Sequence, residues 1–247
     1  MKLIEILKDK LRYTKLHFFL LKYKNPKYID YLKKDNNFYK NLLNNTDLVF
    51  DLGAHYGDKT HAFEKLSNKV ISYEPTTELF KKLKNRFRNN KSIIIENKLI
   101  SDEVGLVKFY SLKKNKACST IKKKNLKTIN EDYKIENKLS TTLNNEIEKY
   151  GIPNYVKIDC EGAELEILSN LKYKVNLISF EVNLPDYLKD GIQILKSLSA
   201  KFNYDYNLRK NGEFSLYLQK NINPEEMIEF ISNMNFTIEI FCFLKNK

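Results

Sequence analysis

Short apolar runs alternate with amphipathic segments along most of this chain, starting near residue 47. The apolar runs predict buried strands, whereas apolar residues spaced three or four apart predict helices that pack on one face. Strands are expected at 48–52, 69–73, 92–96, 104–110, 155–158, 177–182, 203–208 and 214–219, and a last apolar run covers 236–244. Helices are expected at 58–66, 76–87, 143–150, 163–171, 187–202 and 224–234.

This alternation predicts an α/β domain over residues 47–247, because strands separated by helices build a parallel sheet covered on both faces. The strands at 203–208 and 214–219 are expected to form an antiparallel pair around Lys210-Asn211-Gly212. Residues 111–138 are rich in Lys and Asn and only weakly periodic, which predicts a mobile loop.

Residues 1–46 have the pattern of a basic, helical N-terminal extension. They hold eleven Lys and Arg against four Asp and Glu, which is more than half of the net charge of +12. Charges interrupt every apolar run before it reaches the roughly 18–20 residues of a membrane-spanning helix, and no secretory signal is recognisable. The extension is expected to pack on the domain as a lid, and peripheral membrane contact through residues 1–24 is the alternative.

The composition narrows the functional classes. Three widely spaced cysteines without a Cys-x-x-Cys pair favour a reducing, cytoplasmic compartment over a disulfide framework or a structural zinc site. The three histidines, at 17, 55 and 61, are too scattered to predict a metal site. The positive charge is nearly all Lys, whereas bidentate contacts to phosphate and guanine favour Arg, so the case for sequence-specific DNA recognition is weak.

A glycine loop, Asp51-Leu52-Gly53-Ala54-His55-Tyr56-Gly57, follows the first predicted strand. Ligands of open α/β sheets bind at the carboxyl ends of the strands, and a glycine there lets the backbone approach a ligand closely. The loop lacks the glycine that admits a pyrophosphate in the dinucleotide fingerprint, and Asp51 would repel a diphosphate. A carboxylate at this point suits a cofactor with an ammonium and a sulfonium, such as S-adenosylmethionine.

Glu74 closes the second predicted strand, about 20 residues beyond the glycine loop. A carboxylate in this place can accept hydrogen bonds from two ribose hydroxyls. The alternative is that Asp51 and Glu74 only cap the helices that follow them. Together, at the ends of adjacent strands, the two carboxylates favour a cofactor that contains adenosine.

Three segments together resemble the FkbM-type methyltransferases: Val49–Gly57, Tyr73-Glu74-Pro75 and Val156–Glu164, of which the last is the most specific. Further matches are Asn97–Asp102, Ser119-Thr120, Leu143 and Glu181-Val182, so that the resemblance covers residues 46–210. His55 departs from the usual family residue, Asn, and is expected to keep a donor role.

The resemblance implies a class I, Rossmann-like fold with a seven-stranded, mostly parallel sheet and helices on both faces. It also implies an S-adenosylmethionine-dependent methyltransferase that O-methylates a hydroxyl of a sugar, glycan or small metabolite. The expected cofactor-binding residues are Asp51, Gly53, Ala54, His55, Tyr56, Gly57, Thr60, Glu74, Pro75, Ser101 and Asp102. Asp102 is the expected acceptor for the adenine amine.

The predicted strand at 155–158 leads into Asp159-Cys160-Glu161-Gly162, not into the Asn/Asp-Pro-Pro-Tyr/Phe pattern of amine-directed methyltransferases. Two carboxylates that flank a small residue favour deprotonation or orientation of a hydroxyl, so Asp159 or Glu161 is the candidate catalytic group. A structural reading, with Glu161 as a helix cap and Glu164 facing solvent, is the alternative. Cys160 is expected to be a small buried neighbour and not a nucleophile.

Three further residues are candidates for contact with the substrate. Ser119 and Thr120 are expected near the substrate entrance, and Glu181 is expected to face the acceptor. Metal dependence is not expected.

Two other functions stay open from the sequence. An RNA methyltransferase or nucleic-acid-binding protein would use the basic N-terminus, and its binding would weaken steeply with salt. A non-catalytic module of the same fold would bind a partner without cofactor affinity, although Asp51, Gly53 and Glu74 argue against it.

Overall fold

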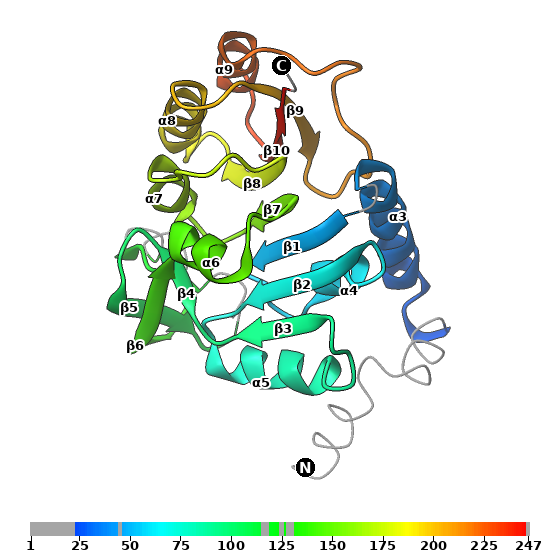
Figure 1. Ribbon diagram of the computed structural model, residues 1–247, viewed down its shortest axis with the longest axis vertical. Coiled ribbons are helices and arrows are strands. Elements are labelled where there is room, and N and C mark those ends of the chain that lie inside the picture. Colours follow the sequence, from blue (N-terminus) through cyan, green and yellow to red (C-terminus); the bar gives the residue numbers. More distant parts are fainter. Residues whose placement is uncertain (1–22, 44–45, 115–118, 124–125, 127–130, 246–247) are drawn as a thin grey trace.

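The computed structural model describes residues 23–43, 46–114, 119–123, 126 and 131–245 (Figure 1). The strands of its central sheet are β1 Thr46–Leu52, β2 Ser67–Tyr73, β3 Ile93–Glu96, β7 Tyr155–Ile158, β8 Leu177–Asn183, β9 Tyr204–Lys210 and β10 Thr237–Leu244. They lie in the order β3-β2-β1-β7-β8-β10-β9, with parallel pairing from β3 to β8 and antiparallel pairing of β10 with both of its neighbours. The expected seven-stranded, mostly parallel sheet is confirmed.

Helices cover both faces of this sheet (Figure 1). They are α3 Pro26–Leu42, α4 Asp58–Phe63, α5 Thr77–Arg86, α6 Leu143–Tyr150, α7 Glu164–Ser169, α8 Leu188–Ser199 and α9 Pro224–Ser232. The first three pack on one face and the last four on the other. No helix within the described ranges is both long and apolar enough to cross a membrane.

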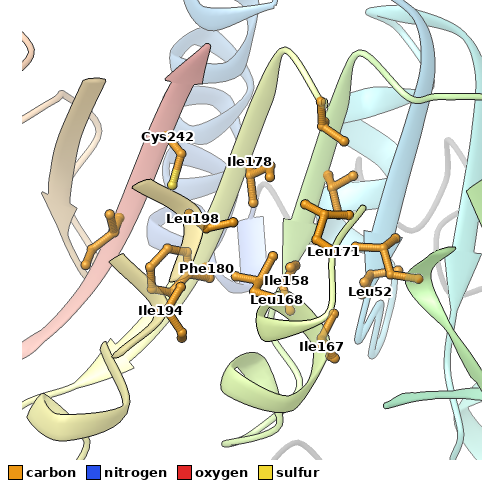
Figure 2. Packing of buried hydrophobic residues seen from close by; sticks show 14 of the residues in the cluster. Leu52, Ile158, Ile167, Leu168, Leu171, Ile178, Phe180, Ile194, Leu198 and Cys242 are labelled. Carbon is orange, nitrogen blue, oxygen red and sulfur yellow. The ribbon is translucent and has the colours of Figure 1, made fainter. Parts of the chain in front are cut away.

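The larger core lies between the sheet and the helices α6 to α9. Figure 2 shows Leu52, Ile158 and Phe180 of the sheet packed against Leu168 of α7 and Leu198 of α8. All five side chains are at most 1% exposed. Because each fully buried aliphatic or Phe side chain contributes roughly 1.5–3 kcal/mol, this layer fixes the strand ends that carry the site.

The described part of the N-terminal extension is helical and packs on the domain. Asn25 caps α3 by accepting a hydrogen bond from the Tyr28 backbone N–H at 3.2 Å, and Pro26 occupies the first turn, where it costs no helical hydrogen bond. Inside the second core, Tyr39 of α3 meets Phe63 edge-to-face at 4.9 Å. The alternative of membrane contact through residues 1–24 falls almost wholly on residues 1–22, which lie outside the described part.

A small second sheet contradicts part of the loop predicted at 111–138. Its strands are β4 Leu99–Ser101, β5 Gly105–Leu112 and β6 Tyr133–Thr142, in the order β4-β6-β5. Strand β6 was not recognised because its apolar and polar positions are reversed with respect to burial. Ile135 and Leu139 face solvent, while Lys138 is 9% exposed and donates to Thr77 Oγ1 at 2.8 Å. The short strand β4 was not predicted either.

The antiparallel pair predicted between 203–208 and 214–219 is also wrong. The partner of β9 is β10, and residues 214–219 form no strand. The side-chain amide of Asn207 bonds both the N–H and the carbonyl of Leu218, each at 3.1 Å. A side chain therefore provides contacts that a neighbouring strand would otherwise make.

Candidate active site

The register of the central sheet aligns several polar residues along its carboxyl edge. In the register of β1, β7 and β8, Leu52 pairs with Ile158, and Ile158 pairs with Phe180. The residues that follow them, Gly53, Asp159 and Glu181, therefore start a common row, and Glu74 follows β2 in the same way. On the other side, β10 places Glu239 opposite Glu181.

Gly53 brings the glycine loop into direct contact with the end of β7. Its φ is +79°, and a Cβ would lie 1.9 Å from the backbone oxygen of Asp159. The N–H groups of Gly53 and Ala54 both donate to the Tyr73 carbonyl at 3.0 Å. Only glycine can occupy this position, because any side chain would push the loop away from β7.

Gly57 has a different role from Gly53. Its φ is +80°, and a Cβ there would lie 2.4 Å from Leu83 Cδ2 and 2.9 Å from Phe87 Cε2. This glycine therefore permits close packing of α4 against α5 and does not line the cleft.

Asp51 is completely buried beneath the loop. Its Oδ2 accepts a hydrogen bond from Thr60 Oγ1 at 2.6 Å, and that hydroxyl also lies 2.9 Å from Ser72 Oγ. Oδ1 has no hydrogen-bond partner among the described residues. Burial raises the pKa of Asp51, and the ammonium of Lys157 opposes this shift. A buried acceptor of this kind can receive a donor from a ligand.

Glu74 holds the start of the cleft through backbone hydrogen bonds. Its carboxylate accepts from the His55 N–H at 2.9 Å and from the Thr76 N–H at 2.7 Å. Because Thr76 precedes α5, the capping role considered from the sequence exists, yet Glu74 also lines the cleft. Burial raises the pKa of Glu74 to about 7. Its carboxylate keeps lone pairs for further donors.

His55 occupies the left-handed region, with φ of +50°. Asn and His are among the few residues other than glycine that adopt this conformation readily, so His can replace the usual Asn of the family. The donor to Glu74 is the His55 backbone N–H, not the imidazole. The departure from the family pattern therefore preserves the hydrogen bond.

These elements line a cleft whose open space, including the part continuous with solvent, is about 540 Å³. The predicted site residues that line it are Gly53, His55, Glu74, Pro75, Ser119, Asp159 and Glu161. Apolar side chains that sequence reasoning missed, including Ile100, Phe109 and Ile121, complete the wall. The cleft thus presents both apolar and polar side chains to a ligand.

Other predicted cofactor residues support the cleft or lie away from it. Ala54, Tyr56 and Thr60 do not line it, and Thr60 acts through Asp51. Ser101 is bonded to Ser140 Oγ at 2.7 Å within the small sheet, and Asp102 is exposed and does not line the cleft. Ser101 and Asp102 are therefore not among the residues that line the cleft.

The acidic loop after β7 is built around a buried lysine. Lys157 Nζ donates to Asp159 Oδ2 at 2.9 Å. Although burial acts against the charged form, the carboxylates of Asp159 and Asp51 raise the pKa of Lys157 well above its ordinary value. This lysine was not predicted as a site residue. Its place beneath two carboxylates depends on the sheet register, which no local motif reveals.

Glu164 fixes the turn that precedes α7. It is only 7% exposed, and its Oε1 accepts from the Cys160 N–H at 2.8 Å. The alternative that Glu164 faces solvent is therefore wrong. Glu161 has φ of +52°, and the Thr120 hydroxyl donates to its backbone carbonyl at 2.8 Å. Cys160 is only partly buried and lines the cleft, unlike the buried neighbour expected from the sequence. Desolvation raises the pKa of its thiol, which disfavours the nucleophilic thiolate.

Comparison with known proteins identifies the family. A model of the FkbM methyltransferase domain matches residues 51–238, which is most of the chain. The chain belongs to the FkbM methyltransferase family. The match extends beyond residue 210, where the motifs recognised in the sequence end.

Solved structures that match this FkbM methyltransferase are distant. Precorrin-6y C5,15-methyltransferase from Geobacter metallireducens is 10% identical, with a TM-score of 0.45 over 88% of this chain and 87% of that one. Fibrillarin from Aeropyrum pernix, solved with S-adenosylmethionine, is 7% identical, with a TM-score of 0.46 over 81% of this chain and 67% of that one. A search of curated proteins finds no match.

The cleft fits S-adenosylmethionine, the methyl donor implied by the family. Asp51 does not itself line the cleft, but beneath the loop it offers a buried acceptor without a partner among the described residues, and Gly53 keeps the backbone open to close approach. Glu74 lies where it can receive ribose hydroxyls. No group of three or more His, Cys, Asp or Glu within the described residues is placed to hold a metal ion.

Replacing Glu74 with Gln is expected to weaken S-adenosylhomocysteine binding about tenfold, as loss of a charged hydrogen-bond acceptor would. Since the pKa of Glu74 is about 7, wild-type affinity rises as pH increases through that value and the carboxylate forms. Calorimetry between about pH 6 and about pH 8 measures both effects. Glu78→Gln, on the outer side of α5, is the control. Equal pH profiles for wild type and Glu74→Gln would contradict this role.

Proposed function

We propose that this FkbM methyltransferase transfers a methyl group from S-adenosylmethionine to a hydroxyl oxygen of a small-molecule or glycan acceptor. The observation that carries the proposal is the position of Asp159. Its side chain is 35% exposed, lines the cofactor cleft and is held by Lys157 from below. A carboxylate at this point can orient a hydroxyl and take its proton.

The two candidate carboxylates differ in their surroundings. Burial, followed by the charge of Asp159, raises the pKa of Glu161 to about 9, so Glu161 keeps its proton at neutral pH. A protonated carboxyl donates a hydrogen bond and cannot act as a base. Lys157, in contrast, stabilises the negative charge of Asp159 at 2.9 Å. We therefore assign the orienting or basic role to Asp159 and a donor role to Glu161.

The chain's contribution to the reaction is placement and proton handling. The bound cofactor supplies an electrophilic methyl group on a sulfonium, which needs an aligned oxygen nucleophile. Asp159 aligns the acceptor hydroxyl and receives its proton, while Lys157 balances the charge beneath. Gly53 and Glu74 hold the reactants at the carboxyl edge of the sheet.

Replacing Asp159 with Asn is expected to lower methyl transfer by about 10²–10⁴-fold, the usual contribution of a positioned general base. Transfer of a labelled methyl group to a panel of hydroxylated acceptors measures the rate, and calorimetry with S-adenosylhomocysteine measures cofactor binding. Asp205→Asn, at the opposite edge of the sheet, is the matched control. Wild-type turnover of Asp159→Asn would rule out this role.

A further inference from the structure

A second cavity lies on the other side of Asp159 from the cofactor cleft. Its open space is about 640 Å³, part of which is continuous with solvent. Asp159 lines both cavities, so a ligand in each would meet at this carboxylate. The second cavity therefore has the position that an acceptor requires.

The walls of this cavity come from strand ends and from α3. Glu181 of β8 follows the register partner of Ile158, and so lies beside Asp159. Arg209 of β9 and Glu239 of β10 extend the row, and Tyr31 of α3 also lines the cavity. The cavity is thus closed by a helix that lies outside residues 51–238, the part matched by the family model.

The cations around this cavity are already neutralised by the protein. Lys59 Nζ lies 2.6 Å from Asp35, and Arg209 lies 2.6 Å from Glu239 and 3.1 Å from Asp35. A phosphate would have to compete with these buried partners.

Glu181 differs from these paired charges. Its carboxylate has no hydrogen-bond or ion-pair partner within the described residues, although it lines the cavity. Burial and the neighbouring Asp159 raise the pKa of Glu181 to about 8. A half-buried carboxyl without a partner can form a hydrogen bond with a hydroxyl group of a ligand. It can do so in either protonation state, because a hydroxyl both donates and accepts.

We propose that the second cavity is the acceptor site and that it selects an uncharged, hydroxyl-rich acceptor without phosphate, through a hydrogen bond to Glu181. This inference rests on the proposed methyl transfer. Tyr31 adds an aromatic surface, and Lys59 keeps further N–H donors for hydroxyls. Because Tyr31 belongs to α3, part of the acceptor specificity resides in this helix and not in the family domain.

Helix α3 is held firmly enough to act as a wall. The Tyr28 hydroxyl donates to Asp58 Oδ2 at 2.6 Å, and Asp35 is 2% exposed between Lys59 and Arg209. These contacts tie the helix to α4 and β9. They support a fixed cavity and not one formed only when α3 moves.

The test uses the full chain saturated with S-adenosylhomocysteine and saturation-transfer NMR with defined probes. These are the methyl α-glycosides of glucose, mannose and galactose, with glucose 6-phosphate as the charged counterpart. We expect contact with at least one neutral glycoside and about tenfold weaker binding of the phosphate. At about pH 9, where most of Glu181 is ionised, Glu181→Gln should weaken glycoside binding about tenfold because a charged acceptor is lost. It should also narrow the advantage of the glycoside over the phosphate, because the charge that repels the phosphate is gone.

Two controls separate the possible failures. Glu225→Gln, on the exposed side of α9, should behave as wild type in every assay. Calorimetry without sugar tests the proposed function itself, because a chain that binds no S-adenosylhomocysteine is not a working methyltransferase. If the cofactor product binds, three results overturn the acceptor proposal: no glycoside contact, equal binding of the phosphate, or an unchanged charge preference in Glu181→Gln. Tight, salt-sensitive binding of a short RNA in this cavity would do the same.

Discussion

Gly53→Ala is expected to weaken S-adenosylhomocysteine binding about 100-fold or more. A 100-fold loss of affinity corresponds to about 3 kcal/mol, which is the size of a large local strain in the backbone. The added Cβ would lie 1.9 Å from the Asp159 carbonyl oxygen and 2.9 Å from its carbon. Real side chains do not approach backbone atoms so closely, so the glycine loop and the end of β7 must separate. That separation moves the glycine loop away from the cofactor cleft and displaces Asp159, which lines the cleft.

A matched control distinguishes collision from backbone strain. Gly105 also has positive φ, at +127°, but a Cβ there meets no atom within 4 Å. Gly105→Ala should therefore keep cofactor affinity within about twofold, with a small loss of stability. Calorimetry and thermal unfolding of both variants provide the comparison. Gly53→Ala with wild-type affinity would show that the loop does not hold the cofactor.

The elements that follow a regular pattern of apolar residues were predicted correctly from the sequence. Strand 155–158 and helix 143–150 have the same bounds in the structure as in the prediction. In β7 all four residues are buried, and the three apolar ones, Tyr155, Val156 and Ile158, were sufficient to predict the strand. The same logic placed Gly53, Glu74 and Asp159 at strand ends, where they indeed share one cleft.

The sequence did not reveal the environment of residues whose partners lie on other strands or far away in the chain. Ser101 looked like a cofactor contact because it follows the third strand, but its hydroxyl pairs with Ser140, 39 residues away. Lys157 looked like an ordinary polar residue of a strand, yet it is the buried counter-ion of Asp159. No periodicity or motif distinguishes such residues, because the deciding contacts come from register and not from neighbours in the chain.

The buried ion network also escaped sequence analysis and now explains how α3 is attached. Arg209 donates to Glu239 at 2.6 Å, to Asp35 at 3.1 Å and to the Tyr39 hydroxyl at 2.9 Å. Its guanidinium also lies 4.5 Å from the centre of the Phe38 ring. One side chain of β9 thus binds three residues of α3 and one of β10. This arginine therefore adds several contacts to those that Tyr28 and Asp35 make with α4.

Arg209→Ala is accordingly expected to lower the free energy of unfolding by about 3–5 kcal/mol, the cost of leaving buried charges without their partner. Urea unfolding measures the loss. Lys245→Ala is the control: its ion pair with Asp205 at 2.7 Å is partly exposed, and removal of such a pair costs about 0–1 kcal/mol. Equal stabilities of the two variants would show that the network contributes nothing.

The effect of Arg209→Ala should depend on pH in a defined direction. Despite burial, Arg209 lowers the pKa of Glu239 below its ordinary value. A lowered carboxylate pKa stabilises the fold above the unfolded pKa of about 4.3, and that stabilisation is lost as pH falls through the folded value. The difference between wild type and Arg209→Ala should therefore be full near neutral pH and shrink in acid. A difference that grows towards acid would assign the stabilisation to contacts other than the Arg209–Glu239 pair.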